Sequence, residues 1–112
     1  MPVKLSMTSR NGHSSEHFKI TSLTFDVVSS KGSMTVHLWK DKAARLAGCK
    51  SVGRIVLPIG PEEETDANGY KRVIGYSEIP SHTVEQALAK LKQYKLLFQG
   101  VELDFTQAVD DD

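Results

Sequence analysis

The run from Val27 to Ile59 constrains the fold most, because turn signals and short hydrophobic patterns follow one another in it without a break. Ser29-Ser30-Lys31-Gly32 predicts the turn of a β-hairpin, since Ser and Gly are common turn residues. The next segment alternates as a strand does, with Met34, Val36 and Leu38 on one face and Thr35, His37 and Trp39 on the other. A short helix over 41–47 and a strand over 52–59 complete the run. We therefore predict a β-meander interrupted by one short helix.

The predicted short helix has clear boundaries. Asp41 is a good N-cap, because its carboxylate can accept backbone N–H groups of the first turn. Gly48 stands where a helix commonly ends. A helix of two turns is marginal alone, so we expect Leu46 to dock onto the sheet, with Ala43 as a second candidate. In the next strand Pro58 lacks a backbone donor, which favours an edge strand or the last residues of a strand.

The flanking segments predict further strands. Residues 3–7 alternate as a half-buried strand, and Asn11-Gly12 predicts a turn after it. In the strand over 16–28 the apolar phase slips after Ile20. A β-bulge near Thr21-Ser22 is favoured, and a break into two strands is the alternative. Shorter strands are expected over 70–76 and 101–105, and a solvated loop over 60–69.

The C-terminal part contains one amphipathic helix. It is predicted from Ser81 or Thr83 to about Tyr94, because Thr83 and Gln86 have capping-box spacing. Its apolar residues recur at helical spacing and are Val84, Ala87, Leu88 and Leu91.

Together these patterns predict an α+β fold. We expect a small antiparallel, sandwich-like meander of about five or six strands, with one amphipathic C-terminal helix and one short helix between strands. The 112 residues fit a single domain, 1–112. Its acidic end, 110–112, is expected to fray.

Charge and cysteine content narrow the function classes. Lys and Arg number 14, as do Asp and Glu, so no net charge favours nucleic acid or an anionic membrane as a partner. Cys49 is the only cysteine, which rules out an intrachain disulfide and fits a reducing compartment. The N-terminal residues lack an apolar stretch of signal-peptide length. The longest apolar run, 55–59, is too short to span a bilayer.

No motif favours catalysis, a metal or a cofactor. His13 and His17 are four apart, but a turn is predicted there and a third ligand is lacking, so surface or strand-edge histidines are expected. Cys49 follows a helix C-terminus, where the dipole disfavours a thiolate, and is expected to be partly buried and inert. The acids over 62–66 lack calcium-loop spacing. We predict no enzyme activity, no metal and no cofactor.

Trp39 is the first candidate for a protein contact, because Trp is enriched at interaction hot spots. It projects from the strand face opposite Met34, Val36 and Leu38. Two readings stay open, an exposed contact residue or part of a second core face under a helix. Tyr70 and Tyr76 are the next candidates.

Three segments occur in an order that resembles a known group of proteins. The first is Phe18-Lys19-Ile20-Thr21-Ser22-Leu23, the second is the helix from Asp41 to Gly48, and the third is the helix over 84–92 followed by Phe98-Gln99-Gly100-Val101-Glu102. The order resembles that of small, mostly unannotated proteins encoded in tailed-bacteriophage structural modules, near tail and fibre genes. The chain departs from this group at 94–97, where a proline-containing helix end is usual, and has a longer tail after Val101.

The resemblance implies where the protein would act, and it implies no catalytic activity. It implies a structural virion protein of a tailed bacteriophage, such as a tail-tip, baseplate or fibre-attachment component, assembled in the cytoplasm of the bacterial host. Its implied partners are other phage structural proteins, contacted by multiple copies in a symmetric assembly. The alternative is a phage binding module outside the virion, such as an assembly chaperone or a host-factor inhibitor.

Overall fold

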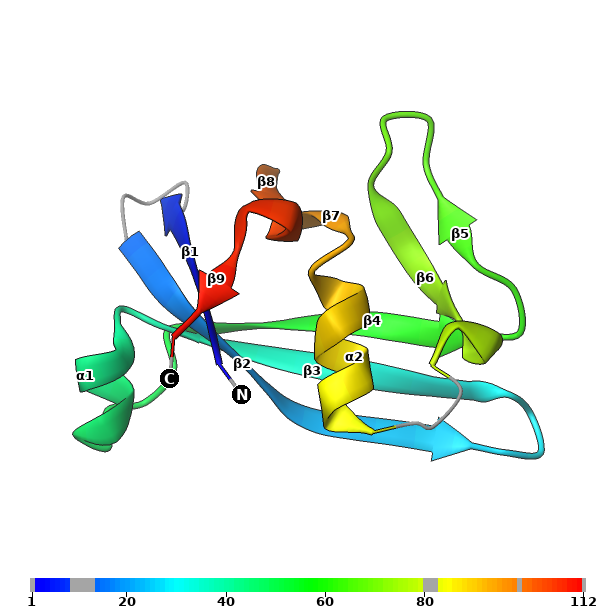
Figure 1. Cartoon of the computed structure of the whole chain (residues 1–112), viewed down its shortest axis with the longest axis horizontal. Coiled ribbons are helices and arrows are strands. Elements are labelled where there is room, and N and C mark those ends of the chain that lie inside the picture. The colour runs from blue at the N-terminus through cyan, green and yellow to red at the C-terminus, as the bar shows by residue number, and fades with distance from the viewer. Residues whose placement is uncertain (1, 9–13, 80–82, 99, 112) are drawn as a thin grey trace.

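The structure is a computed structural model of the chain and describes residues 2–8, 14–79, 83–98 and 100–111. Within these residues the fold is mixed α/β, with a mostly antiparallel sheet and two α-helices (Figure 1). The elements in chain order are β1 (Val3–Thr8), β2 (Ser14–Asp26), β3 (Lys31–Trp39), α1 (Lys42–Leu46), β4 (Gly53–Gly60), β5 (Glu64–Thr65), β6 (Lys71–Gly75), η1 (Tyr76–Glu78), α2 (Val84–Leu91), β7 (Lys95–Phe98), β8 (Val101–Asp104), η2 (Phe105–Gln107) and β9 (Val109–Asp110).

The main sheet has seven strands in the order β5-β6-β4-β3-β2-β1-β9, and β7 and β8 form a separate hairpin. Strands β1 to β4 form the predicted antiparallel meander. The parallel pairing of β4 with β6 was not predicted, and it joins only Ile59 to Ile74 and Gly60 to Gly75. The predicted five or six strands were too few, because short strands such as β5 and β9 give little periodic signal.

The predicted β-bulge in β2 is confirmed. Ile20 lies opposite Val36 and Ser22 lies opposite Thr35, so Thr21 is the extra residue. The bulge corrects the apolar phase along β2. Phe18 and Ile20 are buried before it, and Leu23 and Phe25 pack against the core after it.

The hairpin turn lies two residues earlier than predicted, over Val27–Ser30, where Ser30 adopts a positive φ of 56°. Gly32 is not a turn residue but pairs with Phe25 inside the ladder. A Cβ atom at Gly32 would lie 1.9 Å from the carbonyl oxygen of Thr24. Close approach of two strands therefore requires glycine here.

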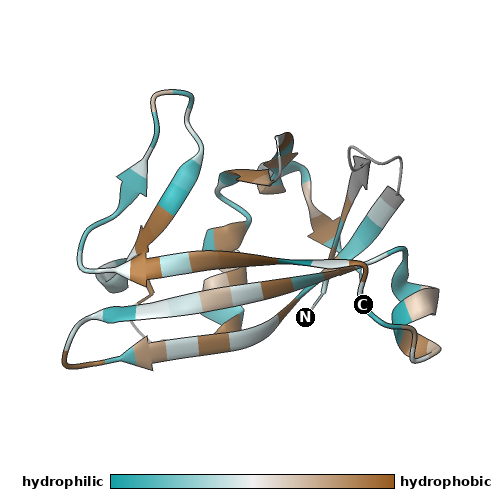
Figure 2. Cartoon of the chain, turned by 180° about the vertical axis from the view of Figure 1, so that it is seen from behind, coloured by the Kyte–Doolittle hydropathy of each residue, from teal (hydrophilic) through white to brown (hydrophobic). Residues whose placement is uncertain are grey.

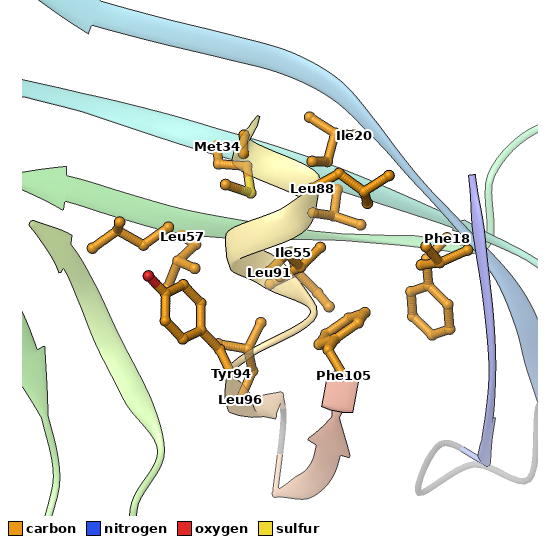
Figure 3. Close-up of a cluster of buried hydrophobic side chains, with 14 of the residues drawn as sticks. Phe18, Ile20, Met34, Ile55, Leu57, Leu88, Leu91, Tyr94, Leu96 and Phe105 are labelled. Atoms are coloured by element: carbon orange, nitrogen blue, oxygen red, sulfur yellow. The ribbon is translucent and has the colours of Figure 1, made fainter. Parts of the chain in front are cut away.

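Helix α2 lies across one face of the sheet, and Figure 3 shows its side chains meeting those of the strands. Ala87, Leu88 and Leu91 are its buried residues. They share one core with buried side chains from the sheet, the β7–β8 hairpin and η2, which include Phe18, Ile20, Met34, Ile55, Leu57, Tyr94, Leu96 and Phe105. Figure 2 shows apolar and polar residues alternating along β2, β3 and β4, seen from behind. The opposite sheet face is not covered by α2, and at its end beside α1 it carries the buried His17.

Both predicted N-caps are present. Asp41 accepts the backbone N–H of Ala44 at 2.8 Å, and Thr83 accepts that of Gln86 at 3.3 Å. Helix α2 ends at Leu91, earlier than the predicted Tyr94. Tyr94 turns into the core, and the chain continues as β7.

The predicted docking of Leu46 is wrong. Leu46 is 67% exposed, and α1 has no buried residue. The helix is held instead by polar contacts. Arg45 Nε donates to Nε2 of the buried His17 at 2.7 Å.

The acidic C-terminus is held rather than frayed at the positions that the structure describes. Asp110 pairs with Val3, and the backbone N–H of Asp111 donates to Pro2 at 3.1 Å. The Asp111 carboxylate also binds His17, so both backbone and side chain anchor this end. Asp112 and the predicted turn at Asn11-Gly12 lie outside the described residues.

Candidate protein-interaction site

Trp39 ends β3 beside α1 and is half-buried. Its indole N–H donates to the carbonyl oxygen of Cys49 at 3.1 Å. Its ring centroid lies 6.0 Å from that of His17 and 6.1 Å from that of His37. Trp39 is therefore neither a fully exposed residue nor part of a second core. One edge of its indole ring is packed, and the rest of the ring reaches solvent.

The two tyrosine candidates lie at opposite ends of β6, away from Trp39. The Tyr70 hydroxyl donates to Glu102 at 3.1 Å, which ties the start of β6 to β8. Tyr76 stacks edge-on against Phe25, with ring centroids 5.8 Å apart, and packs against the core. The structure thus does not gather the three predicted contact residues into one patch.

His17 is the most buried of the polar side chains and contradicts the expected surface or strand-edge position. Its Nδ1 lies 2.7 Å from Asp111 Oδ2. Because arginine can only donate, Nε2 must accept from Arg45, and Nδ1 carries the proton given to Asp111. Both ring nitrogens are therefore occupied. The cluster joins β2, α1 and the C-terminus and leaves no nitrogen for a substrate.

The remaining chemical candidates stay separate. Cys49 is exposed, against the expected partial burial, because the residues after α1 run along the surface. His37 is half-buried and within hydrogen-bond distance of Thr21 Oγ1. Among the described residues, no group of three or more His, Cys, Asp or Glu side chains could hold a metal. His13 and His82 lie outside those residues.

A groove lies between β4 and β7. Strand β6 pairs with β4 only at its C-terminal end, while Tyr70 at its start forms a single parallel bridge with Lys95 of β7. Strand β6 therefore diverges from β4 toward its N-terminal end. Within the described parts of the chain, residues 53–58 of β4 have no strand partner on this side.

The groove has a volume of about 200 Å³. Buried Ile55, Leu57 and Leu96 contribute to its lining. Val56 and Leu97 also line it and are 52% and 50% exposed. An open strand edge beside exposed apolar side chains is a feature that monomeric proteins usually avoid.

Charged residues fix the wall that β6 gives to the groove. Asp66 accepts the backbone N–H groups of Asn68 and Tyr70, each at 2.9 Å, and pairs with Arg72 at 3.3 Å. The bond from Tyr70 is the largest cause that lowers the pKa of Asp66 below its ordinary 3.8. These contacts hold the β5–β6 turn and, through it, Tyr70.

A nearby ion pair holds the same end of β6, at its first residue, Lys71. Lys71 Nζ lies 2.9 Å from Glu63 and 3.5 Å from Glu78. It also sits over the Tyr94 ring, 4.7 Å from its centroid. Burial raises the pKa of Tyr94 well above its ordinary 10.0, and the bond to Glu78 adds to the effect.

The overall neutrality hides a strong separation of charge along the chain. Residues 1–54 contain nine basic residues (Lys or Arg) and three acidic residues (Asp or Glu). Residues 55–112 contain five basic and eleven acidic residues. The total charge of the chain does not reveal this asymmetry, although the charge of each half can be counted from the sequence. The β4-edge groove had no such signal, because it depends on how β6 diverges from β4.

The chain matches no protein-family model, no curated protein and no solved structure. No helix among the described residues combines the length and hydropathy that a bilayer-spanning segment needs.

Proposed function

We propose that this protein is a structural component of a multisubunit assembly and acts by protein–protein contact at the open edge of β4. Its setting is the virion of a tailed bacteriophage, as a tail-tip, baseplate or fibre-attachment component. The setting rests on the resemblance of the three sequence segments. The contact rests on one observation, which is the unpaired stretch 53–58 beside the β4–β7 groove.

An unpaired strand edge presents backbone N–H and C=O groups that an extended segment of a partner can pair with. Side chains beside the edge then supply apolar contact, and here Val56 and Leu97 are exposed for it. Pro58 can donate no hydrogen bond, so pairing is confined to the stretch before it. The site thus fits a short extended segment of another protein.

The arrangement of the helices and the sheet also supports a role in protein–protein contact. We propose that it works as a sandwich-like meander in which α2 covers one sheet face and leaves the other face and the β4 edge to partners. No catalytic step is part of the proposal.

Two matched valines test the contact. Val56 lines the groove, whereas Val109 lies in β9 at the other edge of the sheet and is similarly exposed, at 58% against 52%. Val56→Glu should reduce incorporation into particles roughly thirtyfold, because a hot-spot loss is about 2 kcal/mol or more. Val109→Glu should incorporate as the wild type does. Incorporation can be measured by quantitative immunoblotting of purified particles.

Equal incorporation of the two variants would refute the β4 edge as the contact. Absence of the wild-type protein from particles would favour the alternative, a binding module such as an assembly chaperone or host-factor inhibitor. Circular dichroism should show that both variants remain folded, since both positions are exposed.

A further inference from the structure

A row of basic side chains crosses the sheet face opposite α2. Lys19, His37 and Arg54 are direct neighbours in register on β2, β3 and β4. Each adjoins residues that face the core, so its own side chain projects from the opposite face. We call these three residues the basic row. Lys19 and Arg54 each carry a positive charge on this face, with His37 on the strand between them, so an acidic partner would complement the row.

The molecule does not supply that counter-charge to the row itself. Neither Lys19 nor Arg54 forms an ion pair with any residue that the structure describes. Trp39 extends the row, since its ring lies 6.1 Å from that of His37. The neighbouring connections to α1 add Lys40 and Lys50, both exposed. This end of the molecule is thus basic, open and bordered by an aromatic ring.

The opposite end of the molecule carries free acids. The connection from β4 to β5 contains Glu62 and Glu63, and Glu64 is the first residue of β5; all three are exposed. We call these three residues the acidic β4–β5 segment. Glu63 is engaged by Lys71, whereas Glu62 and Glu64 have no ion pair among the described residues. Figure 1 shows α1 and the β5–β6 arm at opposite ends of the molecule, whose longest extent is 39 Å. The three acidic residues and the basic residues beside α1 therefore lie toward opposite ends of the molecule.

We propose that the basic row binds the acidic β4–β5 segment of a second copy of this chain. The inference rests on the proposed function, which requires several copies in one assembly. Charge complementarity selects this occupant, because a chain with formal net charge zero supplies both the excess of bases in residues 1–54 and the excess of acids beyond them. The contact is heterologous, so it repeats from copy to copy and builds a ring or a filament.

Charge reversal and mixing test the proposal by sedimentation velocity. Wild-type protein should self-associate at about 0.02 M salt and dissociate at about 0.5 M, since exposed ion pairs are screened. Lys19→Glu/Arg54→Glu and Glu62→Lys/Glu64→Lys should each weaken association about tenfold or more. An equimolar mixture of the two variants should associate again, because each then offers the charge that the other lacks. Lys31→Glu and Glu85→Lys, at exposed positions outside both surfaces, should behave as the wild type.

Three results would overturn the proposal. They are a wild type that stays monomeric at low salt, association that ignores the charge reversals, and a mixture that fails to associate. A monomeric wild type that binds fluorescein-labelled oligothymidylate, and loses it with Lys19→Glu/Arg54→Glu, would assign the row to single-stranded nucleic acid instead. Val56 and Arg54 project from the same face of β4, so the two proposals are separated by their readouts. Val56→Glu is read as incorporation into particles, whereas the charge reversals are read as salt-dependent self-association of the isolated protein.

Discussion

At the scale of single residues, polar contacts hold segments that have no buried apolar side chains of their own, such as α1. His17 is fully buried between Arg45 and Asp111. Asp111→Ala should lower the free energy of unfolding by about 1–3 kcal/mol, because it leaves a buried N–H without its acceptor. Asp111→Asn retains an acceptor oxygen and should lose clearly less. Urea denaturation measures both, and equal losses would contradict the assigned hydrogen bond.

A second residue-scale prediction concerns pH. The folded pKa of Asp66 lies below 3.8, chiefly because the backbone N–H of Tyr70 binds the ionised form. A depressed folded pKa gives a stabilising contribution that is present above about pH 3.8 and is lost as the pH falls through the lower folded value. Carboxyl-carbon NMR should therefore show Asp66 titrating below 3.8. A midpoint at or above that value would show that the turn does not hold Asp66 as described.

At the scale of elements, α2 is held by packing. Leu88 is 5% exposed and lies in the core, whereas Val84 on the same helix is 43% exposed. Leu88→Ala should cost about 2–5 kcal/mol of unfolding free energy, as core truncations do. Val84→Ala is the matched control and should cost well under half as much. A loss under about 0.5 kcal/mol for Leu88→Ala would place the residue outside the core.

The open edge of β4 makes a further element-scale prediction. Backbone amides of residues 53–57 that point away from β3 lack a strand partner within the described fold. By hydrogen exchange they should exchange faster than the amides of β3, which is paired on both sides. Protection of these amides throughout the isolated protein would mean that the edge is already covered.

Sequence reasoning succeeded where the signal was local. The alternation of Met34, Val36 and Leu38, the bulge at Thr21 and the caps at Asp41 and Thr83 all depend on near neighbours along the chain. Burial of His17 depends instead on Asp111, 94 residues away. The contact roles of Trp39, Tyr70 and Tyr76 stay predictions. The groove beside Tyr70 follows from the divergence of β6 from β4, which no local pattern encodes.

At the scale of the whole molecule, we propose two surfaces for partners. One is the apolar groove at the β4 edge, and the other is the sheet face that carries the basic row. The basic row lies on the sheet face that α2 does not cover, whereas the groove lies at the edge of β4. The two proposed surfaces adjoin one another, because Val56 of the groove lies two residues from Arg54 of the basic row on the same strand face.

The most direct test of the proposed structural role in a tailed-phage particle is absolute quantification of the protein in such purified particles by mass spectrometry. The account predicts a fixed number of copies per particle, greater than one, that survives washing in high salt because the β4 edge is held by backbone pairing and apolar contact. Particles that are complete and infectious but lack the protein would contradict the structural role.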